Sequence, residues 1–435
     1  KLETSYVEHA YIEPEAGSAW LENNTLVIQA CTQAPIMDRD DTAKILGLNQ
    51  NDVRIIPSTA GGGFGSKLDV SIQPLLGLVT LKTKKPCRII YNRNESMIST
   101  TKRHPGNMTA TIAANKNGKI SGMIFKGDFN TGAYASWGPT VATRVPIHAS
   151  GPYYTPNYKA LGNALHSNGP ISGAFRGFGV PQAAALQETL YDQLADCCNI
   201  DQLEFRKINA LQDGEKTVCG QKLEGVGILE CLNSLTDSWK TAVQNSDKFN
   251  KKSNLIKRGV GLGSCWYGCG NTALPNPATI KIGINKFGKL FLHQGATDIG
   301  QGSNTVITQI CADALGVSIE TFFLIGPDTH LTPDCGKTSA SRQTYITGKA
   351  AELAGKSLRN KILRLSNMGP EADINFINDT IVIEQTQKTH ILKLSEMTEN
   401  EDKYVLSSIE TYDPPTIPLD ENGQGKPYAV YGYGV

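Results

Sequence analysis

Alternating apolar and polar positions recur in five short runs of the chain, each containing β-branched residues. The runs cover residues 24–31, 52–58, 86–92, 108–114 and 119–129. Turns rich in Asn, Gly and Lys separate them, and this pattern predicts strands of a mixed or antiparallel sheet.

Four longer segments repeat their apolar residues at helical spacing. They cover residues 38–48, 181–198, 303–316 and 347–365. In the first segment, the region from Asp38 to Asp41 is expected to cap the helix N-terminus. Pro181 stands in the expected first turn of the second segment, and the third is expected to be capped by Ser303 and to stop at Gly316.

A polar, lysine-rich stretch at 243–258 shows little periodicity and is the candidate linker. It divides the chain into a first domain at 1–242 and a second domain at 259–435, each containing strands and helices. The predicted fold class is therefore α+β, with two consecutive mixed α/β domains.

The composition of the chain bears on its partners, its redox compartment and metal binding. The chain has 435 residues with 42 Lys+Arg against 41 Asp+Glu, so charge gives no reason to expect nucleic acid or an anionic membrane surface. No apolar stretch reaches the roughly 18 residues that a membrane span needs. The ten cysteines lack zinc-site spacing and favour reduced thiols in a cytoplasmic protein, and the seven dispersed histidines do not indicate a protein-ligated metal.

Four segments concentrate glycine and polar residues beside expected strand ends or helix starts. They are AGGGFGSK at 60–67, GAFRGFGVPQ at 173–182, DIGQGSN at 298–304 and KTSASRQT at 337–344. Glycine allows positive φ and lets backbone N–H groups approach a ligand, and a helix N-terminus favours an anion. The structural alternative for each segment alone is a tight turn.

The first segment does not match the common nucleotide motifs. It lacks the four-residue gap of a phosphate loop, and Leu68 follows Lys67 where that motif needs a magnesium-binding hydroxyl. The dinucleotide fingerprint also fails, because Phe64 sits inside the turn and would block close approach of a pyrophosphate. Binding of a nucleotide phosphate by Lys67 is kept as a competing hypothesis.

Taken together, the four segments favour one extended anionic ligand held from several loops. Three glycine turns would supply backbone amides, and further side-chain donors are expected at Ser339, Ser341, Arg342 and Gln343.

The four segments, in this order, resemble the molybdenum-cofactor-binding region of the xanthine dehydrogenase and aldehyde oxidase family of molybdenum hydroxylases. Supporting similarities are HAYIEPEAG at 9–17, CTQAP at 31–35, RNESM at 93–97, KRHPG at 102–106 and GAYASWGP at 132–139. The resemblance covers nearly the whole chain and implies that both predicted domains are molybdopterin-binding domains.

The resemblance implies an oxidoreductase that hydroxylates an N-heterocycle such as a purine or nicotinate, with water as the oxygen source. It implies molybdopterin, in its cytosine dinucleotide form, with molybdenum held by the pterin dithiolene and not by protein ligands. The 2Fe-2S clusters and FAD of such enzymes are expected on other domains or subunits. The complete assembly is expected to be cytoplasmic, as a homodimer or a dimer of heteromers.

Cofactor contacts follow from motif position within the resemblance. Gln33 and Arg176 are the expected catalytic residues, with Gln33 near the metal's oxo ligand and the backbone of Arg176 at the metal-side ligands or the pterin. The remaining cofactor-binding positions are Gly63, Phe64, Gly65, Gly300, Gln301, Gly302, Ser339, Ala340, Ser341, Arg342 and Gln343.

Substrate contacts are expected at Arg144, which matches a substrate-orienting arginine, and at Phe178, which matches an aromatic that packs on the substrate ring. Leu68 stands where purine-oxidising members have a glutamate, whereas nicotinate-type members have leucine. A pocket with Arg144 and without that acid would suit an anionic or less polar heterocycle.

Ordinary structural roles compete with these assignments. Arg144 and Arg176 could be salt-bridge arginines, Phe64 and Phe178 core aromatics, and Gln33 a surface strand residue. His9 and His104 are interpreted as packing or hydrogen-bonding residues.

One part of the family pattern is missing. The general base of the family is a glutamate in a Gly-Glu-Pro-like motif near the C-terminus, and the single Gly-Glu here, Gly214-Glu215, is followed by Lys216. The second domain is therefore expected to be incomplete at its C-terminus, with the remaining molybdopterin region as a partner, and the isolated chain to be inactive. An aldehyde oxidoreductase core and a non-catalytic cofactor-binding scaffold are the other hypotheses.

Overall fold

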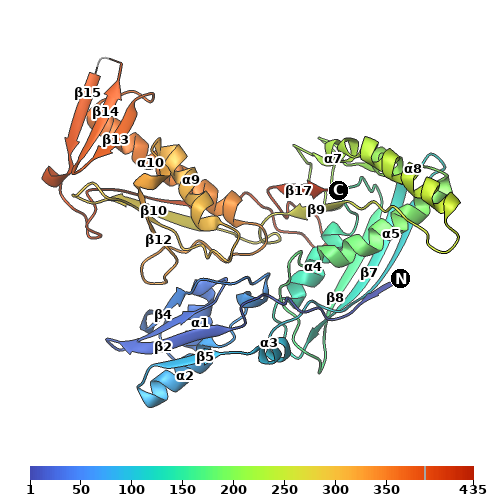
Figure 1. The fold of residues 1–435 in the computed structure, drawn as a ribbon, viewed down its shortest axis with the longest axis horizontal. Helices are drawn as coiled ribbons and strands as arrows, with labels where there is room; N and C mark the ends of the chain where they lie inside the picture. The colour runs from blue at the N-terminus through green and yellow to red at the C-terminus, as the bar shows by residue number, and fades with distance from the viewer. Residues whose placement is uncertain (387) are drawn as a thin grey trace. The chain divides into compact units, whose positions relative to one another are not determined.

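The computed structural model describes residues 1–386 and 388–435 (Figure 1). The chain forms two compact units, each assembled from separated segments. Unit 1 contains residues 1–8, 101–274 and 415–435, and unit 2 contains residues 9–100 and 275–414. Strands and helices occur in both, which confirms the predicted α+β class with mixed α/β domains.

The predicted linker does not coincide with a boundary between these units. Helix α8 (Thr236–Lys252) includes residues 243–252, and the chain on both sides of the stretch 243–258 belongs to unit 1. The division at 243–258 stays a prediction about sequence domains, whereas the compact units are interleaved.

Unit 1 is built on a four-stranded sheet in the order β1-β6-β7-β8, with β7 and β8 parallel. Figure 1 shows β7 and β8 side by side. Helices α4 and α5 pack against it around Phe125, Phe129 and Val145. A separate two-stranded ribbon pairs β9 with β17. The bounds are β1 (Leu2–Thr4), β6 (Gly106–Ala114), β7 (Ile120–Gly132), β8 (Tyr158–His166), β9 (Cys265–Gly268), β17 (Tyr431–Gly434), α4 (Gly138–His148), α5 (Val180–Cys198), α6 (Gln202–Asn209) and α7 (Ile228–Ser234).

Residues 9–100 of unit 2 form a second four-stranded sheet, in the order β4-β3-β2-β5. Helix α1 connects the parallel strands β3 and β4, and the core contains Leu26, Ile28 and Leu76. The bounds are β2 (Ala16–Glu22), β3 (Thr25–Ala30), β4 (Val53–Pro57), β5 (Cys87–Ile90), α1 (Pro35–Leu46), α2 (Gln73–Thr83) and α3 (Arg93–Ser99), with short 3-10 turns at η1 (Gln50–Asp52) and η2 (Ser66–Leu68).

Residues 275–414 of unit 2 form a third sheet, in the order β12-β11-β10-β16, and a meander β13-β14-β15. Ile280, Ile282 and Ile284 alternate along β10 and are fully buried, as a half-covered strand requires. Helices α9 and α10 pack closely at Gly355, which has no side chain. A Cβ there would come 2.7 Å from the Cys311 carbonyl.

The elements of this part are β10 (Ala278–Ile284), β11 (Leu290–His293), β12 (Phe322–Ile325), β13 (Asp373–Ile377), β14 (Thr380–Gln385), β15 (Lys388–Lys393), β16 (Leu406–Tyr412), α9 (Ser303–Leu315) and α10 (Gly348–Ser366), with short helical turns η3 (Ile319–Thr321), η4 (Gln343–Thr347) and η5 (Leu394–Glu396).

All five predicted strands and four predicted helices are present, but two predicted caps are wrong. Helix α1 begins at Pro35, whose fixed φ suits a first turn, so Asp38 lies inside the helix and is buried. Helix α9 begins at Ser303 and its cap is Gly302, with no side-chain capping bond from Ser303. Gly316 does end α9, in the left-handed conformation that glycine allows.

No helix among residues 1–386 and 388–435 combines the length and apolarity that crossing a membrane requires.

Candidate functional site

Gln33 joins two of the predicted ligand-binding segments within unit 2. Its Nε2 donates to the Thr338 carbonyl (2.7 Å), and its Oε1 accepts from the Gly65 N–H (3.0 Å). Its backbone N–H donates to the Lys67 carbonyl, and its carbonyl accepts from the Thr338 N–H. Gln33 is 2% exposed and follows β3, so it is not a surface strand residue.

The glycines of the first segment fit close contacts and unusual backbone angles. A Cβ at Gly63 would lie 2.4 Å from Gln33 Oε1, so only glycine leaves room for this amide. Phe64 has φ +54° and Gly65 has φ +115°, and the Phe64 ring is exposed. A phenylalanine held at positive φ is a strained residue of the kind that collects at ligand sites.

Lys67 and Leu68 point to the interior of unit 2 and are both buried. Lys67 Nζ forms a 2.7 Å ion pair with Glu13, donates to the Glu13 carbonyl and lies over the Tyr11 ring. Its ammonium group is therefore engaged by the chain, which argues against the hypothesis that Lys67 holds a nucleotide phosphate.

Thr338 extends the connection to Thr297, the residue directly before the third segment, because its Oγ1 donates to the Thr297 carbonyl (2.7 Å). The turn that follows is capped internally. The Asp298 carboxylate accepts from the N–H groups of Gly300 (2.9 Å), Gly302 (3.3 Å) and Asn304 (3.1 Å). Asp298 therefore occupies the position at the start of α9 where an anion was expected.

Gln301 is also engaged by its own turn. Its Oε1 accepts from the Ile299 N–H, and its Nε2 donates to the Thr297 carbonyl and to Ser303. On the other side, a Cβ at Gly300 or Gly302 would meet nothing within 4 Å. The glycines therefore offer open space, while the polar groups of the turn satisfy one another.

The fourth segment, residues 337–344, contains an arginine whose donors are all used within the chain. The Arg342 guanidinium, 1% exposed, donates to Asn276 Oδ1 and to the carbonyls of Cys335, Lys337, Asn276 and Pro277, which leaves no donor for a ligand. Gln343 donates to Thr338 Oγ1 and accepts from Thr347.

Ser339, Ala340 and Ser341 differ from Arg342 in this respect. The Ser339 Oγ is buried without a hydrogen-bond partner among residues 1–386 and 388–435. Ala340 and Ser341 both have positive φ, at +53° and +56°, so that the backbone forms a tight turn of the kind whose N–H groups can converge on an anion.

The remaining predicted residues lie in unit 1. Phe178 and Gly179 repeat the positive φ of the first segment, at +48° and +92°, directly before α5. Arg103 fixes this turn: its Nη2 donates to the Arg176 carbonyl (2.7 Å), and its guanidinium carbon lies 4.0 Å from the Phe175 ring centroid. Burial lowers the pKa of Arg103 to about 10. The Arg176 side chain is exposed.

Arg144, on α4, is 1% exposed, and no carboxylate of the described residues lies within ion-pair distance of it. Its Nη1 and Nη2 donate to the carbonyls of Gly270 and Gly268. Tyr267, Tyr428 and Phe178 surround the guanidinium, with ring centroids 4.2, 4.9 and 5.9 Å from its central carbon. The salt-bridge alternative thus does not describe Arg144.

The predicted histidines His9 and His104 are buried. Burial, with the neighbouring Arg103 charge, lowers the pKa of His104 to about 4, so the imidazole is neutral near pH 7. All ten cysteines are free, and the described residues contain no cluster of His, Cys, Asp or Glu side chains that could hold a metal ion.

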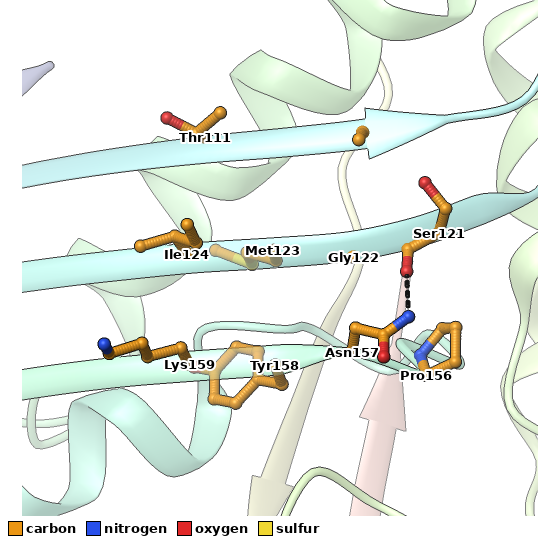
Figure 2. A pocket seen from close by; sticks show the side chains of 10 residues that line it. Thr111, Ser121, Gly122, Met123, Ile124, Pro156, Asn157, Tyr158 and Lys159 are labelled. Carbon is orange, nitrogen blue, oxygen red and sulfur yellow. Dashed lines mark hydrogen bonds between the residues drawn. The ribbon is translucent and has the colours of Figure 1, made fainter.

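A concavity of about 650 Å³ lies over β6, β7 and the start of β8 in unit 1, and Figure 2 shows its lining. Thr111, Ile124 and Lys159 project from its strands, and Asn157 Nδ2 donates to the Ser121 carbonyl (2.8 Å). None of the predicted site residues lines it, so it is not the predicted site.

Three residues with a part in this geometry were missed from sequence: Glu13, Asp298 and Arg103. Glu13 lies in the HAYIEPEAG motif and Arg103 in KRHPG, but their charges gave no sign of what they contact. Asp298 carried a usable signal, because an Asp two residues before the glycines of a helix start is a frequent cap.

Comparisons with known proteins agree with the sequence motifs. Residues 1–210 and 235–435 each match the model of a molybdopterin cofactor-binding domain. The nicotinate dehydrogenase large molybdopterin subunit of Eubacterium barkeri is 42% identical over 231 residues, which is 53% of this chain and 54% of that protein.

Two further relatives cover more of the chain. The xanthine dehydrogenase molybdenum-binding subunit of Escherichia coli O157:H7 is 30% identical over 83% of this chain and 48% of its own length. The solved aldehyde oxidoreductase of Desulfovibrio desulfuricans is 25% identical, with a TM-score of 0.87 over 99% of this chain and 45% of that one. The chain spans about half the length of the curated relatives it matches.

Proposed function

Because this chain belongs to the molybdopterin-binding family of xanthine dehydrogenases and aldehyde oxidoreductases, we propose that it is the cofactor-holding core of a molybdenum hydroxylase acting on an N-heterocycle. The main supporting observation is the hydrogen-bonded chain Gly65–Gln33–Thr338–Thr297, which connects the first and fourth motif segments. It reaches the third segment because the Thr297 carbonyl also accepts from Gln301. If these segments were unrelated tight turns, one buried glutamine would not be expected to bond to both Gly65 and Thr338.

The residues present fit a phosphate-bearing pterin at the turn 339–341. The unpartnered Ser339 Oγ and the N–H groups of Ala340 and Ser341 would hold its polar or anionic part. Four other predicted residues would support the turns without contacting the cofactor, because their polar groups already bond within the chain. They are Gln33, Gln301, Arg342 and Gln343. When bound, the cofactor would supply hydroxylation with water as the oxygen source and would take up the substrate's electrons.

In this proposal Arg144 orients the substrate, Phe178 contacts its ring, and Leu68 excludes the acidic contact that a purine would use. The similarity to nicotinate dehydrogenase supports an anionic N-heterocycle such as nicotinate. A purine remains the second N-heterocycle to test. We also propose the cytosine dinucleotide form of the cofactor, and 2Fe-2S and FAD centres on partner domains or subunits.

The general base and the remaining molybdopterin region are proposed to be supplied from outside residues 1–435, so that the isolated chain does not turn over. The assembly is proposed to be cytoplasmic, as a homodimer or dimer of heteromers. A hydroxylase test on the full assembly decides the main proposal: nicotinate, or hypoxanthine as the second candidate, should give a hydroxylated product that carries oxygen from isotopically labelled water. Activity on aldehydes alone would favour the second candidate, an aldehyde oxidoreductase, which the likeness to the Desulfovibrio enzyme supports.

A further inference from the structure

We propose that Tyr267 and His148 are positioning residues that hold Arg144 as an uncompensated cation, and that they thereby set a preference for a substrate bearing an anionic group. This inference rests on the proposed function of Arg144 as the substrate-orienting residue. It concerns unit 1 alone, to which all three residues belong.

A buried arginine ordinarily has a carboxylate partner, because an uncompensated charge in the interior is costly. Arg206 in the same unit follows this rule, with 2.8 Å ion pairs to Glu188 and Asp192. Arg144 is equally buried and has no such partner among the described residues, and its Nε makes no hydrogen bond to them. No carboxylate of the described residues therefore balances the Arg144 charge, and one of its donors is unused.

Aromatic rings and carbonyls replace the missing carboxylate. Tyr267 is the closest ring, at 4.2 Å from the guanidinium carbon, which is within the range of a cation–π contact. Such rings stabilise a cation without neutralising it, whereas a carboxylate would compete with an anionic substrate. Tyr267 is only partly buried and is thus the more replaceable of the two closest rings, since Tyr428 is fully buried and bonded to Thr272.

His148 fixes the strand that carries these contacts. Its Nε2 accepts from the Gly268 N–H (3.1 Å), so its Nδ1 carries the proton and donates to the Arg144 carbonyl (3.0 Å). Gly268 also accepts from Arg144 Nη2, so one glycine is held by both side chains. A Cβ at Gly268 would come 2.2 Å from the Tyr428 ring, which explains the glycine there.

The test uses the complete enzyme and a matched pair of ligands: nicotinate, which is anionic, and nicotinamide, its neutral counterpart. Equilibrium binding is measured by calorimetry, and KM and kcat are measured where turnover occurs. We expect the unmodified enzyme to bind nicotinate at least tenfold tighter than nicotinamide. Tyr267→Leu should reduce this ratio about tenfold through KM with kcat little changed, and Tyr267→Phe should restore it because the ring is retained.

Molybdenum content and melting temperature serve as folding controls for each variant. Should Tyr267→Leu fail to assemble, His148→Gln, which can keep both hydrogen bonds, and His148→Phe, which loses both, provide the same comparison. The inference is overturned if the unmodified enzyme does not distinguish the two ligands, or if the ring-deleting variant distinguishes them as well as the unmodified enzyme does. Failure of the proposed function looks different, because the complete enzyme would then hydroxylate no N-heterocycle at all.

Discussion

At the scale of single residues, close packing explains the glycines of GGGFG before any ligand is considered. Gly63 lies against the amide of Gln33, and Gly61 lies against Glu13, whose Cβ would be 2.6 Å from an added methyl group. The motif is thus a packing requirement of unit 2 as well as a candidate cofactor loop. The two roles agree, because a rigid loop presents its backbone in one geometry.

Gly63→Ala should destabilise the chain by about 1–3 kcal/mol, because the methyl group would overlap Gln33 Oε1 and push the amide from Gly65 and Thr338. Chemical denaturation measures the change. Gly326→Ala is the matched control in the same unit, since nothing lies within 4 Å of its added Cβ and its φ is ordinary. Equal stability of both variants would show that the Gln33 contact is not tight.

His148 makes a pH prediction at the same scale. Burial, with the neighbouring Arg144 charge, lowers its pKa from 6.5 to about 3. Below pH 6.5 the imidazole is protonated in the unfolded chain but stays neutral in the folded chain. The contribution of His148 to the free energy of unfolding is therefore largest above pH 6.5 and decreases as the pH falls toward 3.

Between pH 6.5 and 5 this one group should lower the free energy of unfolding by about 2 kcal/mol. Urea unfolding at several pH values measures it. His148→Gln cannot titrate there, so its pH slope should be smaller by about 1.4 kcal/mol per pH unit. Parallel slopes for the two proteins would place the pH dependence elsewhere, for example at His104.

At the scale of elements, the turn before α9 shows how a ligand motif and a helix cap can share one sequence. Asp298 satisfies three N–H groups at the positive end of α9, where a carboxylate is favoured. The start of α9 is therefore stabilised by the chain itself.

Asp298→Ala should lower the free energy of unfolding by about 1–2 kcal/mol, because three N–H groups lose their acceptor. Asp313→Ala, at an exposed position in the last turn of the same helix, should be neutral or slightly stabilising, since an acid there opposes the helix dipole. Denaturation curves of both variants check this. A neutral Asp298→Ala would mean that water replaces the cap without loss.

Elements of regular periodicity could be predicted from sequence, and their side-chain partners could not. The alternation of Ile280, Ile282 and Ile284 and the apolar stripe of α10 are local signals, readable within one window of residues. Gln33 and Thr338 meet across 305 positions, and no local pattern encodes such a pair. The resemblance of the motifs to a known family identified the candidate ligand-binding turns. Only the fold shows which hydrogen-bond donors of these turns lack a partner within the described residues.

At the scale of the whole chain, sequence order and compact units differ. Residues 262–274 and 415–435 follow the predicted linker, yet they complete unit 1. Arg206 donates to the Leu262 carbonyl, Glu188 accepts from the Ser264 N–H, and Trp266 stacks on Tyr431 at 4.7 Å. Sequence periodicity gives no warning of this interleaving, because each strand looks ordinary by itself.

The ion pair between Arg206 and Glu188 holds the segment that contains Leu262 and Ser264 in unit 1. Arg206→Met should cost about 3–5 kcal/mol, since it leaves Glu188 buried without its cation. Lys207→Ala removes a pair with Glu204, whose side chain is 55% exposed, and should change stability by less than about 1 kcal/mol. Thermal melts of the two neighbouring substitutions give the comparison, and similar losses would contradict the role assigned to the buried network.

Interleaving also predicts the outcome of cutting the chain. Leu255 and Ile256 are 97% and 66% exposed, so a protease site inserted between Ser253 and Lys257 should be cleaved without unfolding. The two fragments should stay together on size-exclusion chromatography, because β9, β17 and Tyr428 from the second fragment pack in unit 1 around Arg144 and His148. They should separate in denaturant. A separately expressed chain of residues 1–242 lacks those partners and should expose Arg144 and His148 to solvent, with rapid hydrogen exchange in α4. Fragments that part in native buffer, each with cooperative unfolding, would instead support two sequential domains divided at 243–258.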